Sequence, residues 1–431
     1  MNYKSLKKTD PALAQILEAE IKRQKEGLEL IPSENYVSES VLEALGTIFT
    51  NKYSEGYPNK RYYGGQQNTD QVEQIAIDRA KTLFGADHAN VQPLSGALAN
   101  LAVYFSWLEP GDKVLGMKLD QGGHLTHGSP VTKVAGIYDF VRYGIKDLET
   151  GEIDFDQLRE VALSERPKII LAGYSAYPRE LDYQKFKEIA DEVGAIAFAD
   201  IAHIAGLIAA GEMRNPFDFG FQVVSTTTHK TLRGPRGGMV LTKGTVSNPL
   251  KKVQKTIDNL PTLIDRTVFP GLQGGPIMNI IFAKAIAFGE ALQPEFKEYA
   301  RQVLLNAKTL SNELMKCGFK LVTNGTDNHL ILIDCISSFG ISGGELEKVL
   351  DTVGLTANKN TIPNDTRSPF DPSGLRLGTP AITTRGMKEN DMEVIAKWIL
   401  EAVKHREDQK ALQKLRQEVI EYVKKFSLPG F

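Results

Sequence analysis

Between residues 70 and 242, short apolar runs alternate with amphipathic stretches, and this alternation constrains the fold more than any other feature of the sequence. The runs are rich in Val, Ile and Ala, which is typical of strands that are buried on both faces. They read HANVQPL, DKVLGM, KIILAG, AIAFAD, QVVSTT and GMVLT, and the helical pattern YQKFKEIADEV lies between two of them. The alternation predicts a mainly parallel sheet with helices on both sides.

The segments before the sheet predict one helix and two loops. The stretch TDPALAQILEAEIKRQKEGLEL carries a capping Thr-Asp, a first-turn proline and an apolar face, so it predicts a helix. The loop IPSENYVSESV follows it. The second loop, NKYSEGYPNKRYYGGQQNTD, is long and polar, but its tyrosines and glycine-rich turns favour an ordered, functional segment over disorder. We expect the next helix at 70–84, ending at Gly85.

After about residue 280 the pattern shifts to longer helices, expected at 295–317 and 388–426, with strands such as HLILIDC between them. The sequence therefore predicts three segments. These are an N-terminal helix and arm at 1–69, a large α/β domain at 70–285 and a smaller α+β domain at 286–431.

Composition and charge exclude several classes of protein. The formal net charge of -2 and the pI near 6.4 argue against a nucleic-acid surface as the main function. The N-terminus lacks the apolar core of a signal peptide, and no run has the length of a membrane span. Two cysteines, Cys317 and Cys335, form neither a disulfide framework nor a metal set. We expect a cytoplasmic protein without a metal site.

Three features point to one edge of the predicted sheet. Asp200 ends the run AIAFAD, Lys230 lies just past QVVSTT, and Ser95-Gly96 opens a helix after an earlier strand. The carboxyl ends of parallel strands share an edge, and a helix N-terminus binds anions. Pyridoxal phosphate offers an aldehyde for the lysine, a ring nitrogen for the aspartate and a phosphate for the helix end, so the three together suggest this cofactor. Each feature alone is common in a solvated loop, a turn or a helix cap.

Three further residues have a functional and a plain interpretation. His203, three residues after Asp200, is either a cofactor contact or a core histidine. His124, in the glycine-rich GGHLTHG, either stacks on a cofactor or is solvated. Arg376 in SGLRLGTP, placed near a tight turn, either binds an α-carboxylate through two parallel hydrogen bonds or forms a surface ion pair.

Seven motifs spread over residues 31–381 resemble serine hydroxymethyltransferase. They are IPSEN, EGYPNKRYYGG, GGHLTHGSPV, FADIAHIAGLI, HKTLRGPRGG, FPGLQGGP and SGLRLGTPA. The resemblance implies an aspartate-aminotransferase-like fold (pyridoxal phosphate fold type I) with a mainly parallel seven-stranded sheet and a smaller C-terminal α+β domain. It also implies a homodimer or a dimer of dimers. The activity implied is reversible transfer of the hydroxymethyl carbon of serine to tetrahydrofolate, leaving glycine, through aldimine and quinonoid intermediates.

Carried over by motif, the resemblance assigns roles to individual residues. Lys230 would hold the cofactor covalently, Asp200 would pair with its ring nitrogen and His124 would stack on the ring, with Ser175 and His203 beside it. The expected phosphate ligands are Ser95 and Gly96, joined from the neighbouring subunit by Tyr53, Gly274 and Gly275. The expected substrate-binding residues are Ser33, Arg376, Tyr63 and Arg236, with Glu55 as acid/base. The expected folate contacts are Leu119, Gly123, Leu125 and Asn360.

Two alternatives remain open at this point. One is another pyridoxal enzyme of the same fold, a threonine aldolase or an aminotransferase, although Glu55 and the GGHLTHG loop favour a folate enzyme. Folate-independent cleavage of 3-hydroxy amino acids is expected as a side activity. The other alternative is a non-catalytic binding protein on the same fold, which the net charge does not favour as an RNA binder.

Overall fold

The computed structural model describes residues 3–244 and 260–431 and forms two compact units. The large unit is Ser40–Arg301, and the small unit combines the residues up to Glu39 with Gln302–Phe431. This division differs from the three segments expected from the sequence. The N-terminal residues belong to the small unit because β1 (Leu28–Glu29) pairs in parallel with β13 (Leu355–Thr356).

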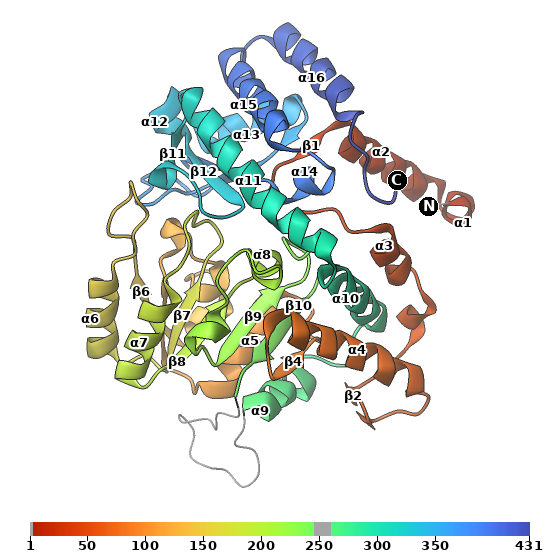
Figure 1. The fold of residues 1–431 in the computed structure, drawn as a ribbon, viewed down its shortest axis with the longest axis vertical. Helices are drawn as coiled ribbons and strands as arrows, with labels where there is room; N and C mark the ends of the chain where they lie inside the picture. The colour runs from red at the N-terminus through yellow and green to blue at the C-terminus, as the bar shows by residue number, and fades with distance from the viewer. Residues whose placement is uncertain (1–2, 245–259) are drawn as a thin grey trace. The chain divides into compact units, whose positions relative to one another are not determined.

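The large unit contains a seven-stranded sheet, shown in Figure 1. Its strand order is β4 (His88–Asn90), β10 (Gly238–Thr242), β9 (Val223–Thr227), β8 (Ile196–Asp200), β7 (Ile169–Gly173), β5 (Lys113–Met117) and β6 (Asp139–Tyr143). The pairs from β9 to β6 are parallel, and β10 runs antiparallel to both β9 and β4. The expected mainly parallel sheet is therefore confirmed, and so is its number of strands.

Helices connect these strands and bury their apolar faces on the sheet. Among them, α5 packs on β9 and β10, and α7 packs on β7 and β8. The helices of this unit are α3 (Glu39–Leu45), α4 (Gln67–Phe84), α5 (Gly96–Trp107), α6 (Phe155–Glu165), α7 (Tyr183–Val193), α8 (Ala205–Ala209), α9 (Leu260–Arg266) and α10 (Met278–Ala291), and α11 (Pro294–Lys316) crosses the unit boundary. The helix expected at 70–84 is confirmed, with Gly85 in the left-handed conformation at its C-cap (φ 63°).

The tyrosine-rich segment before α4 is ordered. It forms a short hairpin of β2 (Gly56–Tyr57) and β3 (Lys60–Arg61). The buried Arg61 guanidinium donates to Asp70 Oδ1 at 2.8 Å and to Glu73 Oε2 at 2.5 Å, and also to the carbonyl oxygens of Ser54 and Gly56. These bonds fix the hairpin on α4, because breaking a buried ion pair leaves an uncompensated charge.

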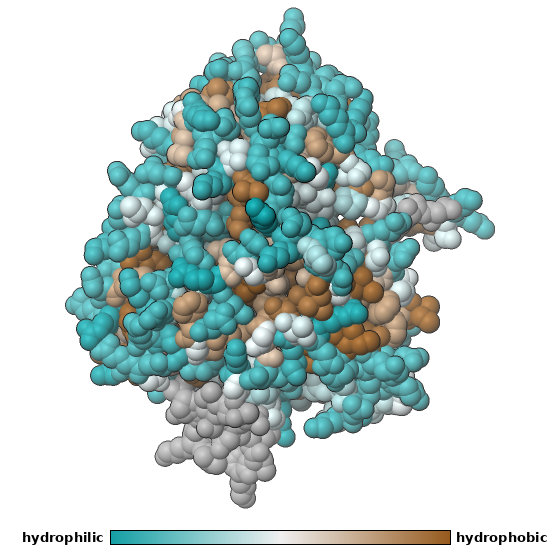
Figure 2. Space-filling model, viewed as in Figure 1, coloured by the Kyte–Doolittle hydropathy of each residue, from teal (hydrophilic) through white to brown (hydrophobic). Residues whose placement is uncertain are grey.

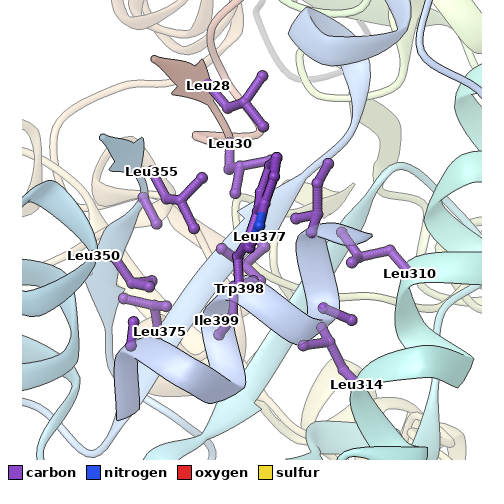
Figure 3. Packing of buried hydrophobic residues seen from close by; sticks show 14 of the residues in the cluster. Leu28, Leu30, Leu310, Leu314, Leu350, Leu355, Leu375, Leu377, Trp398 and Ile399 are labelled. Atoms are coloured by element: carbon purple, nitrogen blue, oxygen red, sulfur yellow. The ribbon is translucent and has the colours of Figure 1, made fainter. Parts of the chain in front are cut away.

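The small unit is built on an antiparallel sheet. Its strand order is β11 (Lys320–Leu321), β12 (Leu330–Asp334), β15 (Gly374–Gly378) and β14 (Asn358–Asn360). Its other helices are α1 (Lys4–Thr9), α2 (Pro11–Glu26), α12 (Cys335–Phe339), α13 (Gly343–Thr352), α14 (Pro380–Thr384), α15 (Glu389–Lys404) and α16 (Gln409–Val423). Figure 3 shows its core, in which Trp398 lies among leucines from several elements, including Leu30 and Leu377.

The single helix expected over 388–426 is wrong, because α15 and α16 are separate. The chain leaves the helix at His405, and the side chain of Asp408 accepts hydrogen bonds from the amides of Lys410 and Ala411. Such an N-cap starts a new helix. No helix in the described part of the chain is long and apolar enough to cross a membrane.

Candidate active site

Lys230 is a buried lysine three residues beyond β9, at the carboxyl edge of the sheet. The threonines on either side of it are anchored. Thr231 Oγ1 donates to the carbonyl of His203 at 2.9 Å and accepts from the amide of Gly206 at 2.9 Å. Thr228 Oγ1 donates to the carbonyl of Pro235 at 2.6 Å. These bonds fix the backbone on both sides of Lys230, and so restrict the positions that its amine can reach.

The chain then folds back in a tight turn that needs glycine. The amide of Gly234 donates to the carbonyl of Thr228 at 2.7 Å, and the amide of Thr228 donates to the carbonyl of Gly237 at 3.1 Å. A Cβ atom on Gly234 would lie 2.7 Å from the Thr228 oxygen, a contact that no larger residue tolerates. We refer to residues 228–238 as the Lys230 loop.

His229 and Arg236 flank the amine within this loop. Burial, followed by the charges of Lys230 and Arg236, lowers the pKa of His229 to about 3, so its imidazole is neutral near pH 7. Arg236 is exposed. The neutral imidazole therefore adds no positive charge to a loop that already contains Lys230, Arg233 and Arg236.

Asp200 is buried at the end of β8 and accepts hydrogen bonds on both oxygens. Its Oδ2 accepts from Asn100 Nδ2 at 2.8 Å and His127 Nε2 at 2.9 Å, and its Oδ1 accepts from the amide of Ala202 at 3.1 Å. Burial alone raises the pKa of Asp200, but the hydrogen bonds from His127 and Asn100 and the nearby histidine rings outweigh it. The pKa of this carboxyl is held well below its usual range.

The tautomer of His127 follows from its two partners. Its Nδ1 accepts from the amide of His124 at 3.1 Å, so Nε2 carries the proton that is donated to Asp200. Asn100 extends the network, because its Oδ1 accepts from Ser225 and its Nδ2 also donates to Thr126. The nitrogen and oxygen ligand atoms of His124, His127 and Asp200 lie within 4.8 Å of one another, but this proximity is explained by these hydrogen bonds.

Ser95 and Gly96 form the N-terminus of α5. The Ser95 hydroxyl caps the helix by accepting from the amide of Leu98 at 3.2 Å. The amides of Gly96 and Ala97 have no acceptor among the described residues. A Cβ on Gly96 would lie 2.7 Å from Thr227 Cγ2, so this turn packs directly on the end of β9. Two open N–H groups at a helix N-terminus, next to the strand that precedes Lys230, suit a phosphate group.

Ser175 and His203 lie together on the same edge of the sheet. Ser175 Oγ is 3.4 Å from His203 Nε2, and the amide of Ser175 donates to the carbonyl of Gly122 at 2.7 Å. His203 is buried, and its carbonyl is held by Thr231. The plain interpretation of His203 as a core histidine and the functional one both agree with this placement.

The loop from Leu119 to Leu125 places His124 between two exposed leucines. Leu119 is 42% and Leu125 is 48% exposed, whereas Gly123 is buried, with no room for a Cβ beside the carbonyl of Met117. His124 is half-buried, and its Nδ1 accepts from the amide of Thr126 at 3.2 Å. Exposed leucines beside a ring-bearing residue suit an aromatic ligand.

A second group of predicted residues gathers around Glu55. Tyr53 and Tyr63 donate their hydroxyl groups to its two oxygens at 3.3 and 3.1 Å, and the two rings meet edge to face at 5.4 Å. A Cβ on Gly275 would lie 3.4 Å from Glu55 Cγ, and one on Gly274 would lie 3.9 Å from Glu55 Oε1. The bond to Glu55 raises the pKa of Tyr63. The structure brings these five predicted residues together within one chain.

The small unit holds Ser33, Arg376 and Asn360. Arg376 lies in the middle of β15, five residues after a turn in which the amide of Asp371 donates to the carbonyl of Ser368 at 2.9 Å. Its Nε donates to Asn358 Oδ1 at 3.1 Å. Burial lowers its pKa to about 10. A Cβ on Gly378 would lie 2.4 Å from Pro32 Cβ, so the end of β15 packs against the loop that contains Ser33. Asn360 ends β14 and donates to the carbonyl of Thr361 at 2.6 Å.

Sequence reasoning missed His127 and Asn100, the two side chains that hold Asp200. His127 had a signal, because GGHLTHG contains a second histidine three residues after the first. Asn100 had none, since its contact with Asp200 spans 100 residues.

Comparison with known protein families decides between the alternatives. A sequence model described as serine hydroxymethyltransferase matches residues 6–399 of the 431. The chain belongs to the serine hydroxymethyltransferase family. Members of this family are pyridoxal-phosphate-dependent one-carbon transferases that interconvert serine and glycine. They bind pyridoxal phosphate on a lysine, use tetrahydrofolate as co-substrate and are typically oligomeric. Family membership confirms the expected fold class, in agreement with the observed seven-stranded sheet.

The residues at the sheet edge fit this cofactor. Lys230 offers a buried amine, Asp200 a carboxylate held in its ionised form, and α5 two open amides. Asp200 Oδ1 accepts one hydrogen bond, which leaves room for a ring N–H.

Proposed function

We propose that this protein transfers the hydroxymethyl carbon of L-serine reversibly to tetrahydrofolate, giving glycine and 5,10-methylenetetrahydrofolate, with pyridoxal phosphate held on Lys230. The observation that carries the assignment of Lys230 is its anchored, buried position at the sheet edge that also carries Asp200. The cofactor, when bound, supplies a protonated ring that accepts the electron pair released when the Cα–Cβ bond of serine breaks.

The large-unit residues have distinct roles in this proposal. Asp200 stays ionised and keeps a proton on the ring nitrogen, because its pKa is well below neutral. His127 and Asn100 hold that carboxylate in place. Ser95 and Gly96 bind the phosphate through the open amides of α5, while His124, Ser175 and His203 contact the ring.

Several residues are assigned to substrate recognition. Arg376 and Ser33 bind the carboxylate of the amino acid, since a guanidinium matches a carboxylate through two parallel hydrogen bonds. Arg236 supports this site with its charge, and Tyr63 lies beside the substrate. Glu55, whose two oxygens are aligned by tyrosine hydroxyl groups, moves the proton of the serine hydroxyl group. The folate contacts are Leu119, Gly123, Leu125 and Asn360.

We propose a homodimer, or a dimer of dimers, with shared sites. Tyr53, Gly274 and Gly275 reach the cofactor phosphate of the neighbouring subunit. Exposed apolar side chains support this assembly, since Ile48 is 83% and Tyr62 is 73% exposed. Figure 2 shows apolar side chains gathered over α10 and the segment that follows α3. A stable, active monomer in light scattering would refute the shared site.

A side activity follows from the same residues. Cleavage of a 3-hydroxy amino acid such as allothreonine, which gives glycine and acetaldehyde, needs the cofactor, Lys230 and Asp200, but no folate. Purified protein that releases no glycine from allothreonine would refute this part of the proposal.

The proposed function is tested with purified protein, pyridoxal phosphate, serine and tetrahydrofolate. We expect glycine and methylenetetrahydrofolate in equal amounts, and a visible absorption band that shifts to long wavelength only when glycine and tetrahydrofolate are both present. Lys230→Ala abolishes both signals, whereas Lys297→Ala, which removes an exposed lysine of α11, preserves them. A spectrum that ignores folate would favour the aldolase or aminotransferase, and no cofactor band would favour the binding protein.

A further inference from the structure

Lys284, on α10, is a fully buried lysine that has no part in the proposed chemistry. It is 1% exposed. Its Nζ donates to three backbone carbonyl oxygens, those of Val91 at 2.6 Å, Gly238 at 2.7 Å and Pro93 at 3.2 Å. Three acceptors require three N–H groups, so this geometry requires the ammonium form.

The three carbonyl groups belong to the two backbone segments next to the turn that carries Ser95 and Gly96. Val91 and Pro93 lie in the segment between β4 and α5, and Gly238 is the first residue of β10. The amide of Gly238 donates to Pro93 at 2.9 Å. A Cβ on Gly238 would lie 2.4 Å from the Ser95 oxygen, so the strand and the turn are in direct contact. Lys284 therefore joins the two backbone segments on which the turn rests.

The same segment depends on side chains for its other hydrogen bonds. Gln273 Oε1 accepts from the amide of Leu94 at 3.0 Å, and its Nε2 donates to the carbonyl of Gln92 at 3.1 Å. The segment lies outside the sheet, and buried backbone groups must find partners elsewhere. Lys284 and Gln273 supply these partners on the approach to α5.

The stem of Lys284 also contacts the far end of the Lys230 loop. A Cβ on Gly237 would lie 2.5 Å from Lys284 Cε and 3.2 Å from Thr228 Oγ1. The Lys230 loop therefore packs directly against the side chain of Lys284, and a residue larger than glycine at position 237 would contact it too closely. One buried side chain thus contacts both backbone segments that flank the proposed cofactor site.

Burial disfavours the charged form of Lys284 and lowers its pKa to about 7, although the charge of Glu73 opposes the shift. Keeping the ammonium buried therefore costs free energy. A neutral side chain of equal length would fill the space without that cost. Each of the three carbonyl oxygens would then lose the hydrogen bond that it accepts from Lys284. The cost is consistent with a role for the charge itself.

We propose that Lys284 is a positioning residue that fixes the phosphate-binding turn at Ser95 and Gly96, an inference that rests on the proposed role of that turn. The proposed role requires no contact between Lys284 and the cofactor. It acts by holding the backbone from which the open amides of α5 project.

The test compares pyridoxal phosphate with pyridoxal, which lacks the phosphate. Cofactor-free protein is titrated with each compound. The dissociation constant for pyridoxal divided by that for pyridoxal phosphate measures how much the phosphate strengthens binding. In Lys284→Met we expect this ratio to fall by about tenfold, in line with loss of hydrogen bonds to a charged group. Lys297→Met, which changes an exposed helical lysine of the same unit, leaves the ratio unchanged.

Lys284→Gln has a shorter side chain with fewer donors, and we expect it to give an intermediate ratio. If Lys284→Met does not fold, Lys284→Gln decides by the same ratio. An unchanged ratio, or a parallel loss of affinity for both compounds, would overturn the inference, because a general loss of packing affects both equally. A wild-type protein that binds neither compound would instead refute the proposed function.

Discussion

His127 Nε2 donates a hydrogen bond to Asp200 Oδ2 over 2.9 Å, inside a network in which every partner is buried or backbone. Because His127 Nδ1 accepts from a backbone amide, the proton on Nε2 has a fixed place. The bond favours the ionised carboxylate at the end of β8.

Asp200→Asn should lower kcat by about 10²- to 10³-fold, the usual effect of removing a preorganised electrostatic group. The amide has nearly the same shape, but it lacks the charge that keeps a proton on the ring nitrogen. Steady-state rates with saturating serine and tetrahydrofolate measure the effect. Asp218→Asn, an exposed aspartate of the large unit, serves as the control. A loss below threefold would contradict the assigned role.

His127→Gln should lower kcat by about tenfold, less than Asp200→Asn, because a positioning residue acts through the group it holds. Since the bond from His127 lowers the pKa of Asp200, the remaining activity should also decline at a higher pH on the acid side than in the wild type. The measurement is a pH profile of kcat. An identical profile in both proteins would count against this role.

Thr231→Val removes one hydroxyl group without changing the volume of the side chain. It leaves the carbonyl of His203 and the amide of Gly206 without this partner in a buried site. We expect a loss of about 1–3 kcal/mol in the free energy of unfolding, the cost of unsatisfied buried groups, together with a lower kcat. Urea unfolding measures the first effect. A variant as stable as the wild type would show that Thr231 does not anchor the loop.

His229 predicts a pH dependence of stability in the cofactor-free protein. Its folded-state pKa of about 3 lies below the unfolded value of about 6.5, so between these values the unfolded chain binds more protons. Stability should therefore fall as the pH is lowered from 7 to 5. In His229→Asn, which keeps an acceptor for the amide of Gly237, this part of the decline should disappear. Equal slopes of melting temperature against pH would contradict it.

Arg376→Lys should raise KM for serine by about 10- to 100-fold while cofactor binding stays unchanged, because an ammonium cannot reproduce the forked pair of hydrogen bonds to a carboxylate. Initial rates of glycine formation, measured at a series of serine concentrations, give KM. Unchanged KM would remove Arg376 from the substrate site.

The sequence was sufficient to predict secondary-structure elements that depend on residues close together in the chain. The helix at 70–84 and its end at Gly85 follow from periodicity and one residue, and the parallel strands follow from apolar runs. The position of Asp200 and Lys230 at one edge was predictable because each lies at or just past the carboxyl end of a parallel strand. Contacts over long sequence separations were not predictable. Asn100 and Lys284 reach partners 100 and 193 residues away, and neither lies in a pattern that distinguishes it from an ordinary helical residue. The break between α15 and α16 was missed because the N-cap at Asp408 interrupts a pattern that is helical on both sides.

The most direct test of the central claim is to identify the amine that carries the cofactor. The holoenzyme is treated with borohydride, which makes the bond between cofactor and lysine permanent, and is then digested and analysed by mass spectrometry. We expect one pyridoxyl adduct, on the peptide that contains Lys230. An adduct on Lys284 or on any other lysine in its place, or no adduct at all, would contradict it.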